Sequence, residues 1–185
     1  MKWGYAVGGL SLFGVGTIYI LTLEMMHYRI ESIEERALTA LQDISKGQAS
    51  FREGTYYGEG RHVYANPRDG RGLVDLYQLE GGRKTALVTA AVADAAADVA
   101  PASGYYYASV PCEDYEKQFA VCATPAGYAR TGRHVYFLDT TGVVYRIDPR
   151  ELDPSLRSGD RVKPLAARPS RDELMERGWL PVAQL

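Results

Sequence analysis

The sequence contains little cysteine and little histidine, with 2 Cys and 3 His in 185 residues. Structural metal sites and disulfide frameworks need several such residues at short spacings, so neither is the basis of this fold. The formal net charge is −2, which leaves no excess of positive charge for binding nucleic acid. Phe is also rare, with 4 residues against 14 Tyr. Because Tyr suits half-buried sheet surfaces, this ratio favours β-strands.

Sequence motifs of catalysis are lacking as well. No nucleophile motif, phosphate-binding loop or pair of catalytic acids occurs, and the Cys spacing does not match a haem attachment motif. Asp94 and Asp98 lie one helical turn apart in an Ala-rich stretch, which is typical of a solvated helix face. We therefore expect no enzymatic activity, no catalytic residues, no metal and no cofactor.

One long segment, 3–23, carries no charge. About 20 such residues are enough for a helix to cross a bilayer. Lys2 precedes the segment and acidic residues dominate the stretch after it, so the positive-inside rule places residues 1–2 in the cytoplasm and the bulk outside. A cleaved secretory signal is the alternative, although no small-residue cleavage pattern comes after the apolar run. We predict a single-pass membrane protein whose helix contacts the lipid bilayer.

Apolar residues continue beyond this segment at steps of three and four, which is the spacing of one helix face. This stripe consists of Ile30, Ile33, Ala37, Leu41 and Ile44. Neither Pro nor Gly interrupts 18–46, so we predict one continuous helix from about residue 3 to residue 46, ended by Gly47. The amphipathic part, 24–47, is expected to bury its stripe on the rest of the chain.

Strand patterns come after two short helical pieces. The helical pieces are predicted at 72–79 and 88–99, and the strands at 104–110, 117–124, 133–139 and 142–148. Their short connections favour antiparallel pairing, and the segment from Asp139 to Gly142 suits a hairpin turn. The predicted fold class is therefore α+β, with a long N-terminal membrane-spanning helix packed on a small antiparallel sheet head, 48–148.

The C-terminal segment, 149–185, is rich in Pro and is expected to be mostly extended. Ser170 and Glu173 fit a capping box at the start of a short helix, and Gly178 fits the end of that helix. The apolar side of this helix packs either on the chain's own head, which we favour, or on a partner.

The two cysteines are Cys112 and Cys122. An even number of Cys outside the cytoplasm indicates a disulfide. Such a bridge closes a short loop and stabilises the fold by about 3 kcal/mol in the chain-entropy model. Two buried free thiols are the alternative.

Small residues in the uncharged segment indicate a contact with another helix. Gly4, Gly8, Ser11 and Gly16 lie near one helix face, where they permit close backbone approach. We predict a helix-packing interface there with other membrane-protein subunits. The alternative is that Gly is simply common in membrane helices.

One pentapeptide occurs twice, as Gly-Arg-His-Val-Tyr at 60–64 and at 132–136. One interpretation is a pair of strands that presents two His and two Arg to a ligand. The simpler interpretation, which we favour, is two strands that share a solvent-facing pattern. His27 lies just after the uncharged segment and is expected at the membrane interface.

Several segments, taken in order, resemble the type IV pilins and the pseudopilins of type II secretion. They are 37–51 at the end of the long helix, 103–107 at a strand entry, and 119–125, 131–137 and 139–145 in the sheet. The resemblance implies a long helix whose first half lies in the membrane, then a loop with short helices and an antiparallel sheet. In that family an acid stands at the fifth position after the processed Gly; here Gly4 would be that residue, and Gly9 stands in place of the acid.

The resemblance implies a protein of the bacterial inner membrane with its head in the periplasm. Our leading hypothesis is a non-catalytic accessory or scaffold subunit of a larger bacterial membrane complex. The complex is either bioenergetic, such as a photosynthetic reaction centre with its antenna, or a secretion machine. The alternative is a minor pilin or pseudopilin, and a third possibility is a ligand-binding module that uses the Tyr-rich face.

Overall fold

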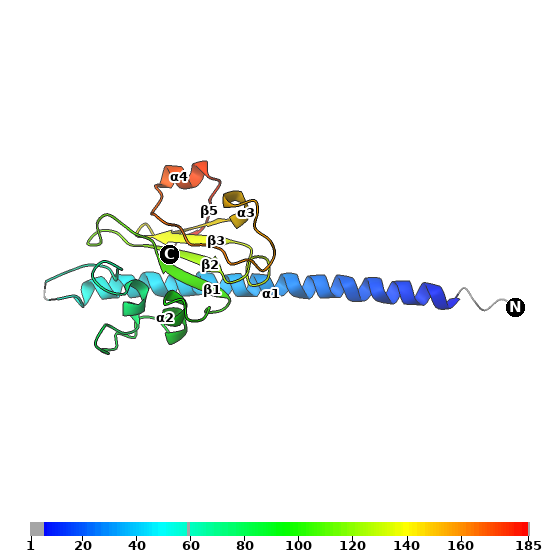
Figure 1. Ribbon diagram of the computed structural model, residues 1–185, viewed down its shortest axis with the longest axis horizontal. Coiled ribbons are helices and arrows are strands. Elements are labelled where there is room, and N and C mark those ends of the chain that lie inside the picture. Colours follow the sequence, from blue (N-terminus) through cyan, green and yellow to red (C-terminus); the bar gives the residue numbers. More distant parts are fainter. Residues whose placement is uncertain (1–5, 59, 185) are drawn as a thin grey trace.

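The computed structural model describes the backbone of residues 6–58 and 60–184, and the side chains of 24–58 and 60–182. A long helix runs under a sheet-containing head and projects beyond it (Figure 1). The elements, in chain order, are α1 Ala6–Glu53, η1 Gly72–Leu76, α2 Ala90–Ala96, β1 Tyr105–Ser109, β2 Ala120–Pro125, β3 Val135–Asp139, β4 Val143–Ile147, α3 Pro149–Leu152, α4 Arg171–Glu176 and β5 Leu180–Gln184.

The sheet has five antiparallel strands in the order β1-β2-β3-β4-β5, so every strand pairs with its neighbour in sequence. The α+β class, the antiparallel pairing and the four predicted strands are confirmed. In the turn between β3 and β4 the Asp139 carboxylate accepts the Thr141 amide at 2.9 Å, and Gly142 has φ 74°. The sequence did not predict β5. Its Pro181 cannot donate to a ladder, and such a strand is tolerated at a sheet edge.

The prediction of a membrane-spanning helix over 3–23 is contradicted. Among the described residues, no helix has both the length and the apolar character that crossing a bilayer requires. The described side chains of α1 begin at Glu24, and charged residues then recur within every turn or two, including Arg29, Glu31 and Arg36. Transfer of such charges into lipid is unfavourable. Residues 1–5, including the predicted cytoplasmic end 1–2, lie outside the described part.

Helix α1 does not end at Gly47 as predicted, but continues to Glu53. A Cβ atom at position 47 would lie 3.2 Å from the Leu87 carbonyl oxygen and 3.3 Å from the Val88 side chain. Gly47 therefore serves close packing inside the helix, where the segment before α2 crosses it, and not chain termination.

One face of the sheet packs on α1, η1 and α2. Ala37, Leu41, Ile44 and Phe51 of α1 are fully buried there, and Ile33 is half-buried against the same cluster. The sheet contributes alternate residues, including Tyr105, Tyr107, Val121, Ala123, Tyr136, Leu138 and Val144. Burial of each large aliphatic side chain contributes about 1.5–3 kcal/mol, so this stripe fixes the head to the C-terminal half of α1.

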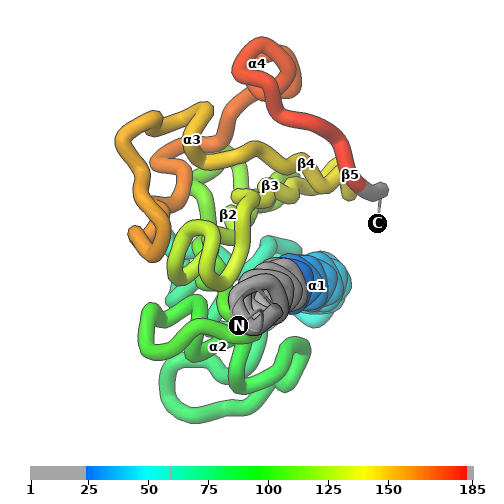
Figure 2. The backbone as a smooth tube through the Cα atoms, turned by 90° about the vertical axis from the view of Figure 1, so that its right-hand side faces the viewer, coloured from blue at the N-terminus to red at the C-terminus, as the bar shows by residue number. Residues whose placement is uncertain are grey.

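The other face of the sheet is covered by the C-terminal segment. Trp179 packs against Phe137, and Leu174 of α4 is buried beside them, whereas Met175 is exposed. The predicted capping box of α4 is confirmed, with Ser170 as its N-cap and Glu173 as its third helical residue. Seen along α1, the sheet therefore separates α1 and α2 on one side from α3 and α4 on the other (Figure 2).

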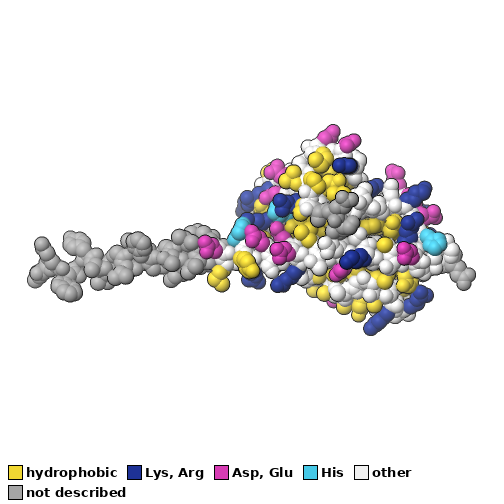
Figure 3. Space-filling view, turned by 180° about the vertical axis from the view of Figure 1, so that it is seen from behind, with side chains coloured by type: hydrophobic (Ala, Val, Ile, Leu, Met, Phe, Trp, Pro, Cys, Tyr) yellow, Lys and Arg dark blue, Asp and Glu magenta, His cyan; other side chains and the backbone are white. Residues whose placement is uncertain are grey.

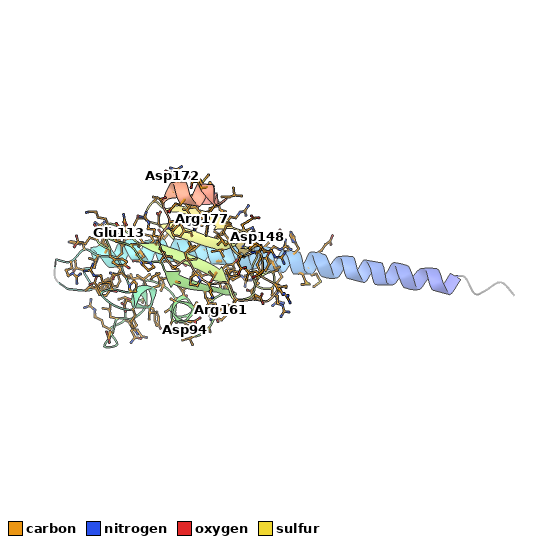
Figure 4. The ribbon with its side chains drawn as sticks, turned by 45° about the horizontal axis from the view of Figure 1, so that its top comes forward. Asp94, Glu113, Asp148, Arg161, Asp172 and Arg177 are labelled. Atoms are coloured by element: carbon orange, nitrogen blue, oxygen red, sulfur yellow. The ribbon has the colours of Figure 1, made fainter. Side chains whose placement is uncertain are left out.

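The same segment also reaches the first strand. The guanidinium carbon of Arg161 lies over the ring of Tyr106 on β1, at 4.3 Å from the ring centroid, and Arg161 pairs with Asp98 just after α2. Figure 4 shows Arg161 beside α2. The C-terminal segment, whose short helix was expected to pack on the head, thus forms a layer of the head.

Candidate interaction site

The helix leaves the head at residues 24–31, which we call the neck. Three large apolar side chains are exposed there, namely Met25 at 73%, Met26 at 53% and Tyr28 at 76% of their surface. Ile30, by contrast, is buried against the head. Scattered exposed apolar residues are ordinary, but three within four positions mark a surface suited to contact another molecule.

A cavity of about 530 Å³ opens between the neck and the loop that connects β2 to β3. Its lining consists of Glu24, Met26, His27, Tyr28, Ile30, Glu31, Ala129 and Arg133. His27 Nε2 lies 3.0 Å from the Glu31 carboxylate, one helical turn away. Figure 3 shows acidic side chains one after another along this part of the helix, with apolar side chains beside them. The lining of the cavity therefore combines apolar and charged side chains.

Just after the neck, α1 is attached to the β2–β3 loop by a contact between residues that are far apart in the sequence. The Glu34 carboxylate of α1 accepts the Arg133 amide at 2.7 Å and the His134 amide at 3.2 Å. Both carboxylate oxygens also lie 3.1 Å from His134 Nδ1. Sequence reasoning missed this site because its two halves are separated by about 100 residues, and no local pattern connects them.

Burial by itself raises the pKa of Glu34, but the hydrogen bonds from His134 and from the Arg133 amide outweigh it. The pKa of Glu34 therefore lies below its ordinary value of 4.5. Tyr136 and Tyr105 face the same carboxylate, and burial followed by this negative charge raises the pKa of each phenol. The carboxylate is thus stabilised as an anion in a position where it fixes the β2–β3 loop to α1.

The first copy of the repeated pentapeptide contacts the other end of α1. His62 Nδ1 lies 3.2 Å from the Arg52 carbonyl oxygen, and Arg52 Nε donates to the His62 carbonyl oxygen at 3.3 Å. Arg52 also lies over the ring of Tyr64, at 5.3 Å from its centroid. Both copies therefore serve the same purpose, which is attachment of a chain segment to α1. Only the second copy enters a strand of the sheet.

The interpretation that both His line one ligand site does not hold. His134 contacts α1 at Glu34 and His62 contacts it at Arg52. These two positions are 18 residues apart, which corresponds to about 27 Å along a helix. The Tyr-rich face is also occupied, because Tyr105 and Tyr107 are buried against α1.

The predicted disulfide is contradicted, because Cys112 and Cys122 are free thiols. Cys122 of β2 stands opposite Ala108, and Cys112 lies four residues beyond Ala108. At about 3.3 Å per residue the two cysteines are separated by on the order of 10 Å, whereas a disulfide needs Cα atoms within about 7 Å. Burial raises the pKa of Cys112 to about 11 and that of Cys122 to about 12.

A second cavity, of about 470 Å³, lies beside Cys112 between the β1–β2 loop and the start of α4. Its polar lining includes Glu113, Gln118, Arg168 and Glu173. Arg168 pairs with the Asp139 carboxylate at 2.6 Å, so its charge is already compensated. Within the described part of the chain, no three His, Cys, Asp or Glu side chains gather closely enough to bind a metal.

The predicted helix-packing interface remains a prediction. Gly4 lies outside the described residues, and of Gly8, Ser11 and Gly16 the structure describes only their place in the backbone of α1. The exposed Met25 and Tyr28 were not singled out in the sequence, because they lie off the stripe that faces the head. Their helical spacing from one another was the available signal.

Comparisons of the chain with family models, with curated proteins and with solved structures gave no match.

Proposed function

We propose that this chain is a non-catalytic accessory or scaffold subunit of a larger bacterial membrane complex. The observation that carries the proposal is the division of α1 into two parts. From Ile30 onward one face of the helix is buried in the chain's own head, whereas at the neck Met25 and Tyr28 are exposed. The remaining helix extends past the head (Figure 1). A helix that projects beyond its own domain is suited to contact other subunits.

The head supports the same role. The paired contacts at Glu34 and Arg52 hold α1 at both ends of its buried part, so the head and the projecting helix keep a fixed relation. A scaffold requires such rigidity, because it positions one partner relative to another. Both a bioenergetic assembly and a secretion machine accommodate a subunit of this design.

Site-specific cross-linking tests the proposal. A photo-reactive amino acid at Tyr28 in the native host is expected to give covalent adducts with other subunits. The same amino acid at Val99, exposed at 72% after α2 and outside the neck, is the matched control. Equal adducts from both positions, or none from Tyr28, would contradict a role for the neck in assembly.

The second candidate function is a minor pilin or pseudopilin. The order of elements favours it, with a long helix, short helices and then an antiparallel meander. This function requires cleavage after Gly4 and methylation of the new N-terminus, so the intact mass of the native protein distinguishes the two proposals. Retention of Met1 argues against the pilin role.

A further inference from the structure

The exposed side of α1 carries one apolar pair at the spacing of a coiled coil. In the coiled-coil notation abcdefg, Met25 and Tyr28 occupy an a and a d position and are exposed at 73% and 76%. Glu24 and Glu31 then fall on g positions, and Arg29 and Arg36 on e positions, all of them exposed. An apolar pair is thus bordered by acids on one side and by Arg on the other (Figure 3).

The head lies on the opposite side of the helix. Its buried contacts come from f positions, and these are Ile30, Ala37, Ile44 and Phe51. The c positions Glu34, Leu41 and Gln48 face the head as well. In the view along α1, no other part of the chain lies beyond the described helix on its outer side (Figure 2). Two chains can therefore meet along the a and d side without a collision of their heads.

The order of the charges selects one partner and one orientation. In a parallel, in-register pair of helices, a g residue faces the e residue five positions later on the partner. Glu24 then faces Arg29 of the second copy, and Glu31 faces Arg36. Both pairs occur twice by symmetry. In an antiparallel pair, g residues would face g residues and Glu would oppose Glu.

We infer that the neck binds a second copy of this chain as a short parallel coiled coil, with Met25 and Tyr28 at its centre and Glu–Arg pairs on both flanks. This inference stands apart from the proposed function, because it does not depend on which larger complex contains the chain. Glu31 also contacts His27 of its own helix at 3.0 Å, and its second carboxylate oxygen remains available for Arg36 of the partner.

The paired region ends toward the head. Glu35 occupies the next d position, where two copies would bring like charges together, so the apolar seam ends at Tyr28 and the Glu31–Arg36 pairs are its last contacts toward the head. In the other direction the backbone of α1 remains helical, and the sequence keeps the spacing with Leu21 at d and Ile18 at a.

Charge exchange on the full-length chain tests the inference. The wild-type protein is expected to sediment as a dimer in analytical ultracentrifugation. Glu24→Arg with Glu31→Arg places Arg against Arg, and Arg29→Glu with Arg36→Glu places Glu against Glu. Each double variant is expected to raise the dimer dissociation constant by at least about tenfold, because four attractive pairs become repulsive. An equimolar mixture of the two should restore a dimer that contains one copy of each.

A matched pair of cysteine variants reports the orientation. Met25 lies at the centre of the seam, so Met25→Cys is expected to form a disulfide between two copies under mild oxidation. Glu35 lies beyond the apolar seam, so Glu35→Cys is not expected to form one.

A wild-type chain that is monomeric at every concentration overturns the inference. Dimers that the charge variants leave unchanged, or a mixture that fails to pair, overturn it equally, since the contact then lies elsewhere. Circular dichroism of each variant confirms that its fold is retained.

Discussion

The Glu34 carboxylate is the point at which a single side chain joins the first helix to the β2–β3 loop. Its four hydrogen-bonded contacts come from Arg133 and His134. Glu34→Gln keeps the shape but replaces an acceptor-only group with one that must present an NH₂ to a donor. We expect a loss of about 1–3 kcal/mol in the free energy of unfolding at pH 7, measured by urea denaturation. Glu35→Gln, one position along and exposed, is the control and should change stability little.

The pH dependence of this contact has a defined sign. Because the pKa of Glu34 is lowered in the folded protein, the stabilisation is fully present above the ordinary value of 4.5 and is lost as pH falls through the folded value. The difference in unfolding free energy between wild type and Glu34→Gln should therefore shrink below about pH 4.5. A difference that stays constant from pH 7 to pH 3 would show that the carboxylate charge is not involved.

The two copies of the repeated pentapeptide begin with glycines that have different roles. A Cβ atom at Gly132 would overlap the hydroxyl and ring of buried Tyr105, whereas Gly60 has no neighbour within 4 Å and has φ 76°. Gly132→Ala should cost about 1–3 kcal/mol through overpacking, and Gly60→Ala about 1 kcal/mol through backbone strain. Differential scanning calorimetry of both variants checks the order. A larger loss for Gly60→Ala would contradict the described packing.

At the scale of elements, α1 is a helix of 48 residues with two different environments. Leu41 is fully buried under the sheet and Met25 is exposed at 73%. Leu41→Ala should lower the free energy of unfolding by about 2–5 kcal/mol, because it removes buried methyl groups and leaves a cavity. Met25→Ala, a comparable truncation on the same helix, should change it by less than about 0.5 kcal/mol at protein concentrations where the chain is monomeric. Comparable losses would mean that the neck is also packed.

The strands and helices were predictable where local pattern and burial agree. The stripe from Ile30 to Ile44 predicted the buried face of α1, and alternation with a good turn predicted β3 and β4. The prediction that Gly47 ends the helix was wrong, because the packing of Val88 against it comes from a distant part of the chain. The strand β5 was missed for a related reason, since its only partner is β4, more than thirty residues earlier.

The candidate site was predictable only in part. A periodic pattern can show that Met25 and Tyr28 share a helix face, but whether the head covers that face depends on the whole fold. The disulfide prediction failed because an even number of cysteines does not show which residues the strand pairing brings together. In the sheet, Cys122 pairs with Ala108, and Cys112 lies too far beyond Ala108 for a disulfide to form.

At the scale of the molecule, the sheet is a middle layer that isolates Cys122 from solvent. Cys122 is fully buried, while Cys112 is only partly buried at the second cavity. Alkylation of Cys122 in the native protein should therefore require global unfolding, and Cys112 should react earlier, though slowly because its pKa is about 11. Mass spectrometry without reductant, over time at pH 8, checks both rates. A mass lower by two hydrogens would show a disulfide, and faster alkylation of Cys122 than of Cys112 would contradict the burial of Cys122.

The contact between Glu34 and the Arg133 amide spans 99 residues of sequence. During synthesis at about 5–20 residues per second, α1 emerges roughly 5–20 s before the β2–β3 loop that it binds. In that interval the buried stripe of α1 can meet η1, α2 and β1 but not yet β3 and β4, whereas each strand from β2 to β5 pairs with the one made just before it. Assembly of the sheet is therefore local and fast, and docking of α1 is the late, long-range step. Until β3 and β4 are in place, part of the apolar face of α1 remains exposed, and a chaperone that recognises amphipathic helices could bind it.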